Sequence, residues 1–357
     1  MYGNVNIPRF YINLLDWLSA NKSLSLAEKK YFRTLPVTRT DIDRTASNDG
    51  GMGYFNVETA TTLGLFNENS FFAILGLEGV VDNVWIGDTQ FRPTWNDGQY
   101  EYAVGPDGKF FVNCEDAGSD FWKMKKNGFA IGSFDGSEIK NIGFRFQDGW
   151  AFGSVVLGCY YDMVESPNLS LEITRSYESV DEITTYNGSS ISNEIGNRQP
   201  VWLNTSPEYG SQPLQAWQIG DSNSINIPRR GRKSWRLKFS FMDSSDLFGP
   251  NQLLSHIRFD LDDGITDSLD TNNPGDTAGN YSNNILTDSN FFSQVWHKTL
   301  NGSLPFIFQP DGGGGKVDRG NYNHDQFYIA RFKDNTLKAT QTSLNTYDVS
   351  VFIEECW

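Results

Sequence analysis

An acidic loop is the part of this sequence whose residue types most directly suggest ligand binding. The loop, within residues 260–276, carries carboxylates at Asp260, Asp262, Asp263, Asp267 and Asp270. Carboxylate oxygens suit Ca²⁺, but an EF-hand has acidic or amide residues at alternating positions and a closing Glu. Because this loop departs from that pattern, we expect a solvated surface loop, with cation binding left as an open alternative.

A run of glycines, Gly312 to Gly315, precedes Lys316 and has a superficial likeness to a phosphate-binding loop. The leading Gly at the required offset is missing, and Val317 stands where a Ser or Thr would hold Mg²⁺. The run is better explained as the flexible tip of a hairpin.

The three histidines, His256, His297 and His324, give no support for a metal site. No Gly-x-Ser-x-Gly elbow is present, although the fold could still assemble a Ser–His–Asp arrangement. Glu354 and Glu355 are neighbours on a predicted strand, so they point to opposite faces and cannot form the carboxylate pair of a glycosidase. We therefore predict no catalytic, cofactor-binding or metal-ligating residue, no cofactor, and a protein that is not an enzyme.

Four tryptophans, Trp85, Trp95, Trp122 and Trp150, could stack on sugar rings. Tryptophan packs more often into a core, where its large ring buries most area. Carbohydrate binding by one or two exposed rings stays an alternative.

The net charge of −15 and the pI of about 4.6 argue against specific nucleic-acid binding, since an acidic surface repels phosphates. The basic residues Arg229, Arg230, Arg232 and Lys233 form a cluster just before a predicted strand. We interpret this cluster as a charged turn that keeps a sheet edge soluble.

The cysteines Cys114, Cys159 and Cys356 are odd in number and widely spaced, which predicts free thiols made in a reducing cytoplasm. The N-terminal residues lack a basic start, and Asn13 and Asp16 interrupt their apolar run, so they make a poor signal peptide. No apolar stretch is long enough to cross a bilayer, so no membrane insertion is expected.

Most elements that must position these residues are strands. Aromatic residues reach 14% and glycines number 34, a combination that favours pleated sheets with tight turns. Helical spacing is clear only in residues 9–35, where Ser25 to Glu28 match a capping box. We predict a helical hairpin there, followed by a polar linker, which together form an N-terminal extension over 1–53.

Short strands separated by Gly-containing turns follow in residues 54–165 and predict a jelly-roll-like sandwich. The predicted strands are 71–76, 84–86, 100–104, 110–112, 129–131, 142–146 and 153–158.

Residues 166–357 form the third predicted domain. Three strands alternate with period 2, each with one buried face. Their apolar residues are Leu169, Leu171 and Ile173, then Trp235, Leu237, Phe239 and Phe241, and finally Tyr347, Val349, Val351 and Ile353. A long excursion is expected over 243–290. A helix over 291–300 ended by Asn301-Gly302 and strands at 304–308 and 327–332 come next.

Several strings in this third domain resemble the distal-tail and minor-tail proteins of tailed bacteriophages. The similar segments are Gly153–Met163 with Ser166–Leu169, Gly231–Ser240, Phe291–Trp296, Leu304–Asp311, Phe327–Phe332 and Tyr347–Glu355. The opening Pro8–Ile12 is similar to openings of related marine-phage structural proteins, and the strand at 71–76 resembles galactose-binding-like jelly rolls attached to such proteins.

The resemblance implies a mainly β protein with a galactose-binding-like sandwich and a split β-barrel tail module. It also implies a virion structural role: a ring, commonly hexameric, at the distal tail, hub or baseplate that connects the tube to the tip or receptor-binding parts. The expected partners are further copies of the chain and other tail proteins such as tube, hub and fibre. The alternative is a carbohydrate-binding adhesion module of the virion that recognises a host surface glycan.

Overall fold

The structure is a computed structural model. It describes residues 5–21, 34, 40–41, 52–56, 65–77, 81–87, 94–96, 99–101, 109–112, 121–122, 128–134, 141–146, 151–152, 154–176, 181–193, 232–248, 288–312 and 327–356. Strands make up 50% of the interpretable residues and helices 14%. This confirms the prediction of a mainly β protein.

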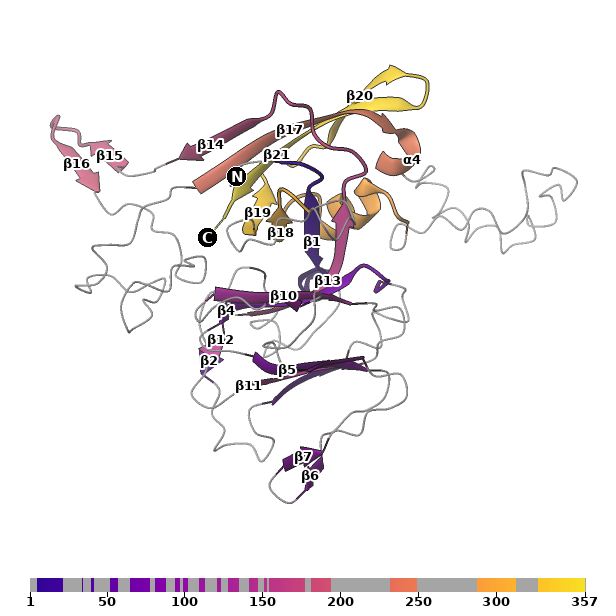
Figure 1. The fold of residues 1–357 in the computed structure, drawn as a ribbon. Coiled ribbons are helices and arrows are strands. Elements are labelled where there is room, and N and C mark those ends of the chain that lie inside the picture. The colour runs from indigo at the N-terminus through magenta and orange to yellow at the C-terminus, as the bar shows by residue number, and fades with distance from the viewer. Residues whose placement is uncertain are drawn as a thin grey trace, which may run out of the picture.

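An 11-stranded antiparallel sheet is the main element of the fold (Figure 1). Its order is β14 (Glu172–Ser176), β17 (Arg232–Asp243), β21 (Thr346–Glu355), β19 (Tyr328–Phe332), β18 (Phe306–Gln309), β1 (Arg9–Asn13), β13 (Ser154–Asp162), β4 (Ser70–Leu77), β10 (Gly128–Phe134) and β9 (Phe121–Trp122), with β20 (Lys338–Ser343) paired to β21. The sheet therefore takes strands from all three predicted segments of the chain. The division into domains itself stays a prediction.

A second, four-stranded sheet contains β3 (Met52–Asn56), β11 (Asn141–Phe146), β5 (Val81–Gly87) and β8 (Lys109–Val112). Figure 1 shows β5 and β11 as a separate layer below β4 and β10. Three strand pairs complete the described residues: β2 (Thr40–Asp41) with β12 (Ala151–Phe152), β15 (Asp181–Thr184) with β16 (Ser190–Asn193), and β6 (Thr94–Asn96) with β7 (Gln99–Glu101).

The central strands of the large sheet are buried on both faces. In β1, Phe10 and Ile12 lie in one core cluster, whereas Tyr11 between them lies in another. β18 and β19 continue both rows, since Phe10 pairs with Phe308 and Tyr11 with Ile307. Apolar side chains on both sides of one strand explain why these segments read as continuous hydrophobic runs.

The first core is rich in aromatic rings that pack around Phe10. The ring centroid of Phe10 lies 5.5 Å from that of Phe306, 5.4 Å from that of Phe308 and 5.8 Å from that of Phe291. Trp235 of β17 reaches the same core, with its ring centroid 5.1 Å from that of Phe308. β17 and the central strands thus share one apolar interior.

The prediction that the N-terminal helical region begins at residue 9 is wrong. Residues Arg9–Asn13 form β1, and the helix α1 spans Leu14–Asn21. The aromatic and β-branched residues of this strand favour a pleated surface, and pairing with β13 and β18 buries them. Asn13 then caps α1, because its Oδ1 accepts hydrogen bonds from the backbone N–H groups of Leu15 and Asp16. The predicted capping box at 25–28 lies outside the described residues.

The predicted helix over 291–300 has unusual winding. Phe292–Trp296 form a π-helix, η5, and His297–Thr299 form a 3₁₀-helix, η6. Its end at Asn301-Gly302 is confirmed, because Leu300, Asn301 and Gly302 all have positive φ angles. Of the long excursion predicted over 243–290, the structure describes the end of β17, the short helix α4 (Ser244–Leu247) and Asp288–Asn290.

Two of the three predicted alternating strands are confirmed by burial, and the third is not. Trp235, Leu237 and Phe239 of β17 are buried, as are Val349, Val351 and Ile353 of β21, whereas Tyr347 is half-buried. The prediction for Phe241 is wrong: it is 81% exposed, because the register of β17 shifts between Phe239 and Met242 and Met242 takes the buried position. Leu169 is instead fully exposed, and Ile173 is 39% exposed. Leu169 precedes β14, and Ile173 lies on this last strand of the sheet, whereas Leu171 between them is partly buried against the first core.

Candidate interaction surface

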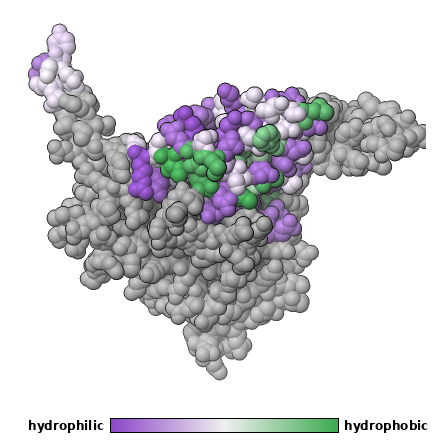
Figure 2. All heavy atoms as spheres, turned by 45° about the horizontal axis from the view of Figure 1, so that its top comes forward, coloured by the Kyte–Doolittle hydropathy of each residue, from purple (hydrophilic) through white to green (hydrophobic). Residues whose placement is uncertain are grey.

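The outward face of β14, β17 and β21 is the best-described polar surface of the molecule. Side chains that alternate with the buried rows point to this face, as the burial patterns of β17 and β21 show. Figure 2 shows this side of the molecule, where hydrophilic residues surround smaller groups of hydrophobic ones. The face is the natural place to look for a function, because its side chains are ordered by the sheet beneath them.

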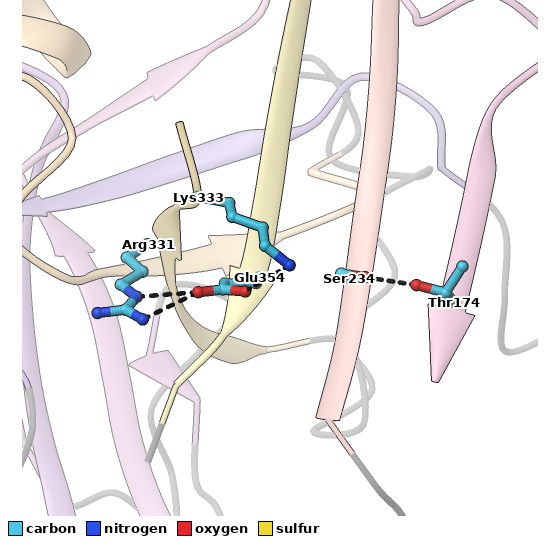
Figure 3. A network of polar contacts seen from close by, with 5 residues as sticks. All are labelled: Thr174, Ser234, Arg331, Lys333 and Glu354. Carbon is cyan, nitrogen blue, oxygen red and sulfur yellow. Dashed lines mark hydrogen bonds and ion pairs between the residues drawn. The ribbon is translucent and has the colours of Figure 1, made fainter. Parts of the chain in front are cut away.

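Cross-strand pairs organise one half of this face (Figure 3). Glu354 of β21 accepts hydrogen bonds from Arg331 of β19 at 2.9 Å and 3.2 Å, and Lys333 Nζ lies 3.4 Å from its other oxygen. On the neighbouring strands the hydroxyls of Thr174 and Ser234 are hydrogen-bonded to each other. The pairs follow directly from the register, which sets Arg331 opposite Glu354 and Ser234 opposite both Thr174 and Glu354.

An aromatic ring with two cations lies beside this network. The Arg236 guanidinium carbon is 5.0 Å from the centroid of the Phe352 ring, and Lys333 Nζ is 4.8 Å from it. Each contact at such an exposed position stabilises by about 0.5–1 kcal/mol. Carboxylates lie beside both cations, because Lys333 is also 3.4 Å from Glu354 and Glu172 is opposite Arg236, so the ring lies within a mixed-charge surface.

The other half of the face has an acidic character. Lys238 Nζ lies 2.6 Å from Asp348 Oδ2, and hydrogen bonding from Lys238 holds the pKa of that carboxyl below its ordinary value. Asp243, at the end of β17, accepts hydrogen bonds from the backbone N–H and the hydroxyl of Ser245. These bonds lower the pKa of Asp243, so both carboxylates stay charged at neutral pH.

Glu354 and Glu355 lie on opposite faces of β21, as predicted. Glu355 is only 3% exposed, and the backbone N–H of Lys233 donates a hydrogen bond to it at 3.0 Å. Burial raises the pKa of Glu355 to about 7, although that hydrogen bond and the nearby charges of Lys233, Arg175 and Arg232 oppose the rise. The pair therefore has no shared catalytic geometry.

The predicted basic cluster turns inward where the structure describes it. Arg232 and Lys233 begin β17, and Lys233 Nζ is hydrogen-bonded to the Tyr328 hydroxyl and lies 4.4 Å from the centroid of that ring. The interpretation of Lys233 as part of a solvated turn is wrong, because its side chain packs on an aromatic ring. Arg229 and Arg230 lie outside the described residues.

A buried lysine was missed by sequence reasoning. Lys298 of η6 is 1% exposed, and its Nζ donates a hydrogen bond to Gln294 Oε1 at 2.7 Å. Burial lowers the pKa of Lys298 to about 8. The position of Lys298 one helical turn after Gln294 did not predict this burial, because a Lys on a predicted helix is ordinarily solvated.

The other residues considered from the sequence form no site in the described part of the chain. His297 is half-buried, its pKa is lowered by burial, and its ring centroid lies 6.0 Å from that of Trp17. Gly312 donates a backbone hydrogen bond to Ile7 and belongs to the packing of β1. His256, His324, Trp150, residues 260–276 and Gly313–Gly315 lie outside the described residues, as do the side chains of Trp85, Trp95 and Trp122.

Two general properties can be stated for the described residues. They contain no group of three or more His, Cys, Asp or Glu side chains placed to hold a metal ion. None of the helices found there has the length and apolar character of a membrane span. Cys159 and Cys356 are free, as predicted, and both are buried, whereas Cys114 is outside the described range.

The chain was compared with models of protein families, with curated proteins and with solved structures. None of the three comparisons found a match.

Proposed function

We propose that this chain is a structural subunit of a bacteriophage tail that forms a ring at the distal tail, hub or baseplate. In this role it connects the tube to the tip or receptor-binding parts, is made in the host cytoplasm and ends in the virion. The segment similarities to distal-tail and minor-tail proteins motivate the proposal. A split β-barrel around the first core and a galactose-binding-like jelly roll in residues 54–165 are the fold assignments that accompany it.

One observation carries the proposal: the large sheet ends in a strand that leaves an apolar side chain partly exposed to solvent. Ile173 of β14 is 39% exposed, and Leu169, which precedes β14, is fully exposed, whereas Leu171 between them packs against the first core. β14 is the last strand of the order, so Ile173 lies at the end of the sheet. A sheet that ends with apolar side chains in solvent is prone to pair with another chain. A ring subunit needs such an end, because its neighbours must cover it.

The two core clusters supply the rigidity that a ring subunit needs. The central strands are packed on both faces, so the charged outer face is held on a fixed platform. Interfaces in permanent assemblies are large and partly apolar. The described residues offer apolar side chains together with organised charge, which fits repeated contact with another protein surface better than a small-molecule pocket.

The test is the state of the purified full-length chain. Negative-stain electron microscopy and sedimentation velocity are expected to show closed rings of uniform size. A chain that stays monomeric at high micromolar concentration and binds members of a glycan array would overturn the ring and favour the carbohydrate-binding alternative. Rings with no glycan binding would support the tail role and remove that alternative.

A further inference from the structure

The hairpin of β15 and β16 presents an aromatic ring to solvent at its tip. The two strands form a sheet of their own, with Thr184 opposite Ser190. In Figure 1 the hairpin projects beyond β14, away from the large sheet. Tyr186 in the connecting turn is fully exposed. A ring of this size usually buries its area in a core, so its place at a projecting tip suggests a binding role.

The turn that carries Tyr186 has a defined conformation. The Thr185 N–H donates to the Ser189 carbonyl at 2.8 Å, and the Gly188 N–H donates to the Thr185 carbonyl at 2.9 Å. Gly188 has a φ of 80°, as expected for the left-handed residue that follows the turn in a three-residue hairpin loop. Because the backbone is already ordered, a ligand that contacts Tyr186 has little loop entropy to remove.

The side chain of Asn187 is held in place beside Tyr186. Its Oδ1 accepts hydrogen bonds from the backbone N–H of Ser189 at 3.3 Å and from the hydroxyl of Thr185. The amide is planar, so an oxygen held by the turn directs the Nδ2 group and its two donors away from the turn. Ser189 and Ser190, which follow, are also exposed. The tip thus combines one flat ring with amide donors and hydroxyls.

Charge is absent from this tip. Residues 183–193 contain no Asp, Glu, Lys, Arg or His, although the net charge of the chain is −15. Ionic ligands and nucleic acids depend on opposite charges in their sites, which the tip lacks. An apolar ligand needs an enclosing pocket, which a projecting turn does not form. A stable protein interface takes about 800 Å² from each partner, whereas one tyrosine ring offers about 150–250 Å².

We propose that the tip of this hairpin binds a neutral saccharide, such as an uncharged hexose of a cell-surface glycan. The C–H face of the sugar packs on the ring of Tyr186, and Asn187 Nδ2 donates a hydrogen bond to a sugar hydroxyl. The hydroxyls of Ser189 and Ser190 are available for further hydrogen bonds. A sugar is the small ligand that offers both an apolar face and uncharged hydrogen-bonding groups, which are the two kinds of surface at the tip. The site uses none of the tryptophans considered from the sequence.

A single tip is expected to bind weakly. One ring and a few hydrogen bonds correspond to a dissociation constant on the order of 1 mM. Several copies in one ring would contact a glycan-coated surface together and raise the apparent affinity by about 10²–10⁴-fold. This gain rests on the proposed tail ring, whereas the site on a single copy does not.

The experiment measures sugar binding by the full-length chain. Saturation-transfer NMR with the methyl glycosides of glucose, galactose and mannose detects weak binding, and an array of neutral and charged oligosaccharides detects multivalent binding. Tyr186→Ala is expected to weaken binding roughly tenfold or more, and Tyr186→Phe, which keeps the ring, to retain most of it. Asn187→Asp keeps the acceptor for the Ser189 N–H but removes the amide donors, so binding should fall severalfold. Phe241→Ala is the matched control, because it removes an 81% exposed ring from β17 and should bind as the wild type does.

The outcomes separate this inference from the ring. A wild-type chain that binds no neutral sugar overturns it, as does binding that is unchanged in Tyr186→Ala or equally reduced in Phe241→Ala. Loss of self-association in Tyr186→Ala, without sugar binding by the wild type, would assign the tip to a protein contact and overturn the sugar site. Rings that bind no sugar leave the tail proposal standing, whereas monomers whose sugar binding requires Tyr186 support the site and count against the ring. Circular dichroism of every variant shows that lost binding is not lost folding.

Discussion

The central strands of the large sheet are buried on both faces, whereas its outer strands are buried on one face only. β1, β18 and β19 place apolar side chains in a core on each face, so most of their residues contribute to stability. β17 and β21 place one row in the first core and expose the other, which carries charges and the Phe352 ring. The difference teaches that stability is concentrated in the middle of the sheet, which leaves the outer face free to evolve contacts.

The largest expected effect is in the central strands. Phe10→Ala removes a fully buried ring that contacts the rings of Phe291, Phe306, Phe308 and Phe332. We expect a loss of about 3–5 kcal/mol in the free energy of unfolding, since a large cavity is left in an aromatic core. Urea denaturation followed by fluorescence measures it. Phe352→Ala on the outer face is the matched control and should lose about 1–2 kcal/mol, from two cation contacts. Equal losses would refute the contrast between the two regions.

A second way to test the central strands is to crowd them. A Cβ added at Gly158 of β13 would lie 1.8 Å from the Ile12 carbonyl oxygen of β1. Gly158→Ala must therefore push two backbones apart, and we expect a loss of about 2–3 kcal/mol in the free energy of unfolding. At Gly188, by contrast, nothing lies within 4 Å of an added Cβ, and its φ of +80° is the only penalty. Gly188→Ala should cost about 1 kcal/mol, and a milder effect at Gly158 would show that β1 and β13 do not approach so closely.

The sequence predicted the outer strand β17 and the central strands β4, β13, β18 and β19, but not the central strand β1. Trp235, Leu237 and Phe239 alternate with polar residues, and that period alone identifies a strand with one buried face. The segment around Phe10 has no such alternation, because both of its faces are buried. Its apolar residues run on into those of α1 at Leu14 and Trp17, so the combined spacing imitated one longer helix. A short continuous apolar run cannot be assigned by periodicity.

The candidate surface could be predicted only in part. That Glu354 and Glu355 point apart follows from strand geometry alone. That Glu354 meets Arg331 and Lys333 depends on the register between β19 and β21, which no local pattern encodes. The exposure of Leu169 and Ile173 was mispredicted for a related reason: a sequence shows which residues share a face but not where the core beneath that face ends.

The buried carboxyl on the inner face of β21 gives a pH-dependent test. The pKa of Glu355 rises from 4.5 to about 7 on folding, so the folded chain binds more protons than the unfolded chain between these values. Its contribution to stability is therefore fully present below pH 4.5 and is lost as the pH rises through 7. Glu355→Gln keeps an acceptor for the Lys233 N–H but has no charge to bury. We expect it to raise the free energy of unfolding at pH 8 by about 1–3 kcal/mol and to leave it little changed at pH 4.

The measurement is a series of urea denaturations from pH 4 to pH 8. Glu354→Gln on the outer face is the matched control, because it changes the same residue type one position away on an accessible surface. Its series is the baseline against which the step of Glu355→Gln is measured. If Glu355→Gln instead lowers stability more at pH 8 than at pH 4, the carboxyl is held by its ion pairs rather than opposed by its burial.

The smallest expected effect lies on the outer face itself. Arg331→Gln removes the guanidinium from Glu354 but leaves Lys333 at 3.4 Å from that carboxylate. Arg331 and Glu354 are both partly solvated, and such pairs contribute about 0–1 kcal/mol to the free energy of unfolding. The loss should shrink further in 1 M NaCl, where charges are screened within about 3 Å. A large loss in the free energy of unfolding that salt does not reduce would mean that the outer face is as important for stability as the centre. The proposed difference between the two regions would then be wrong.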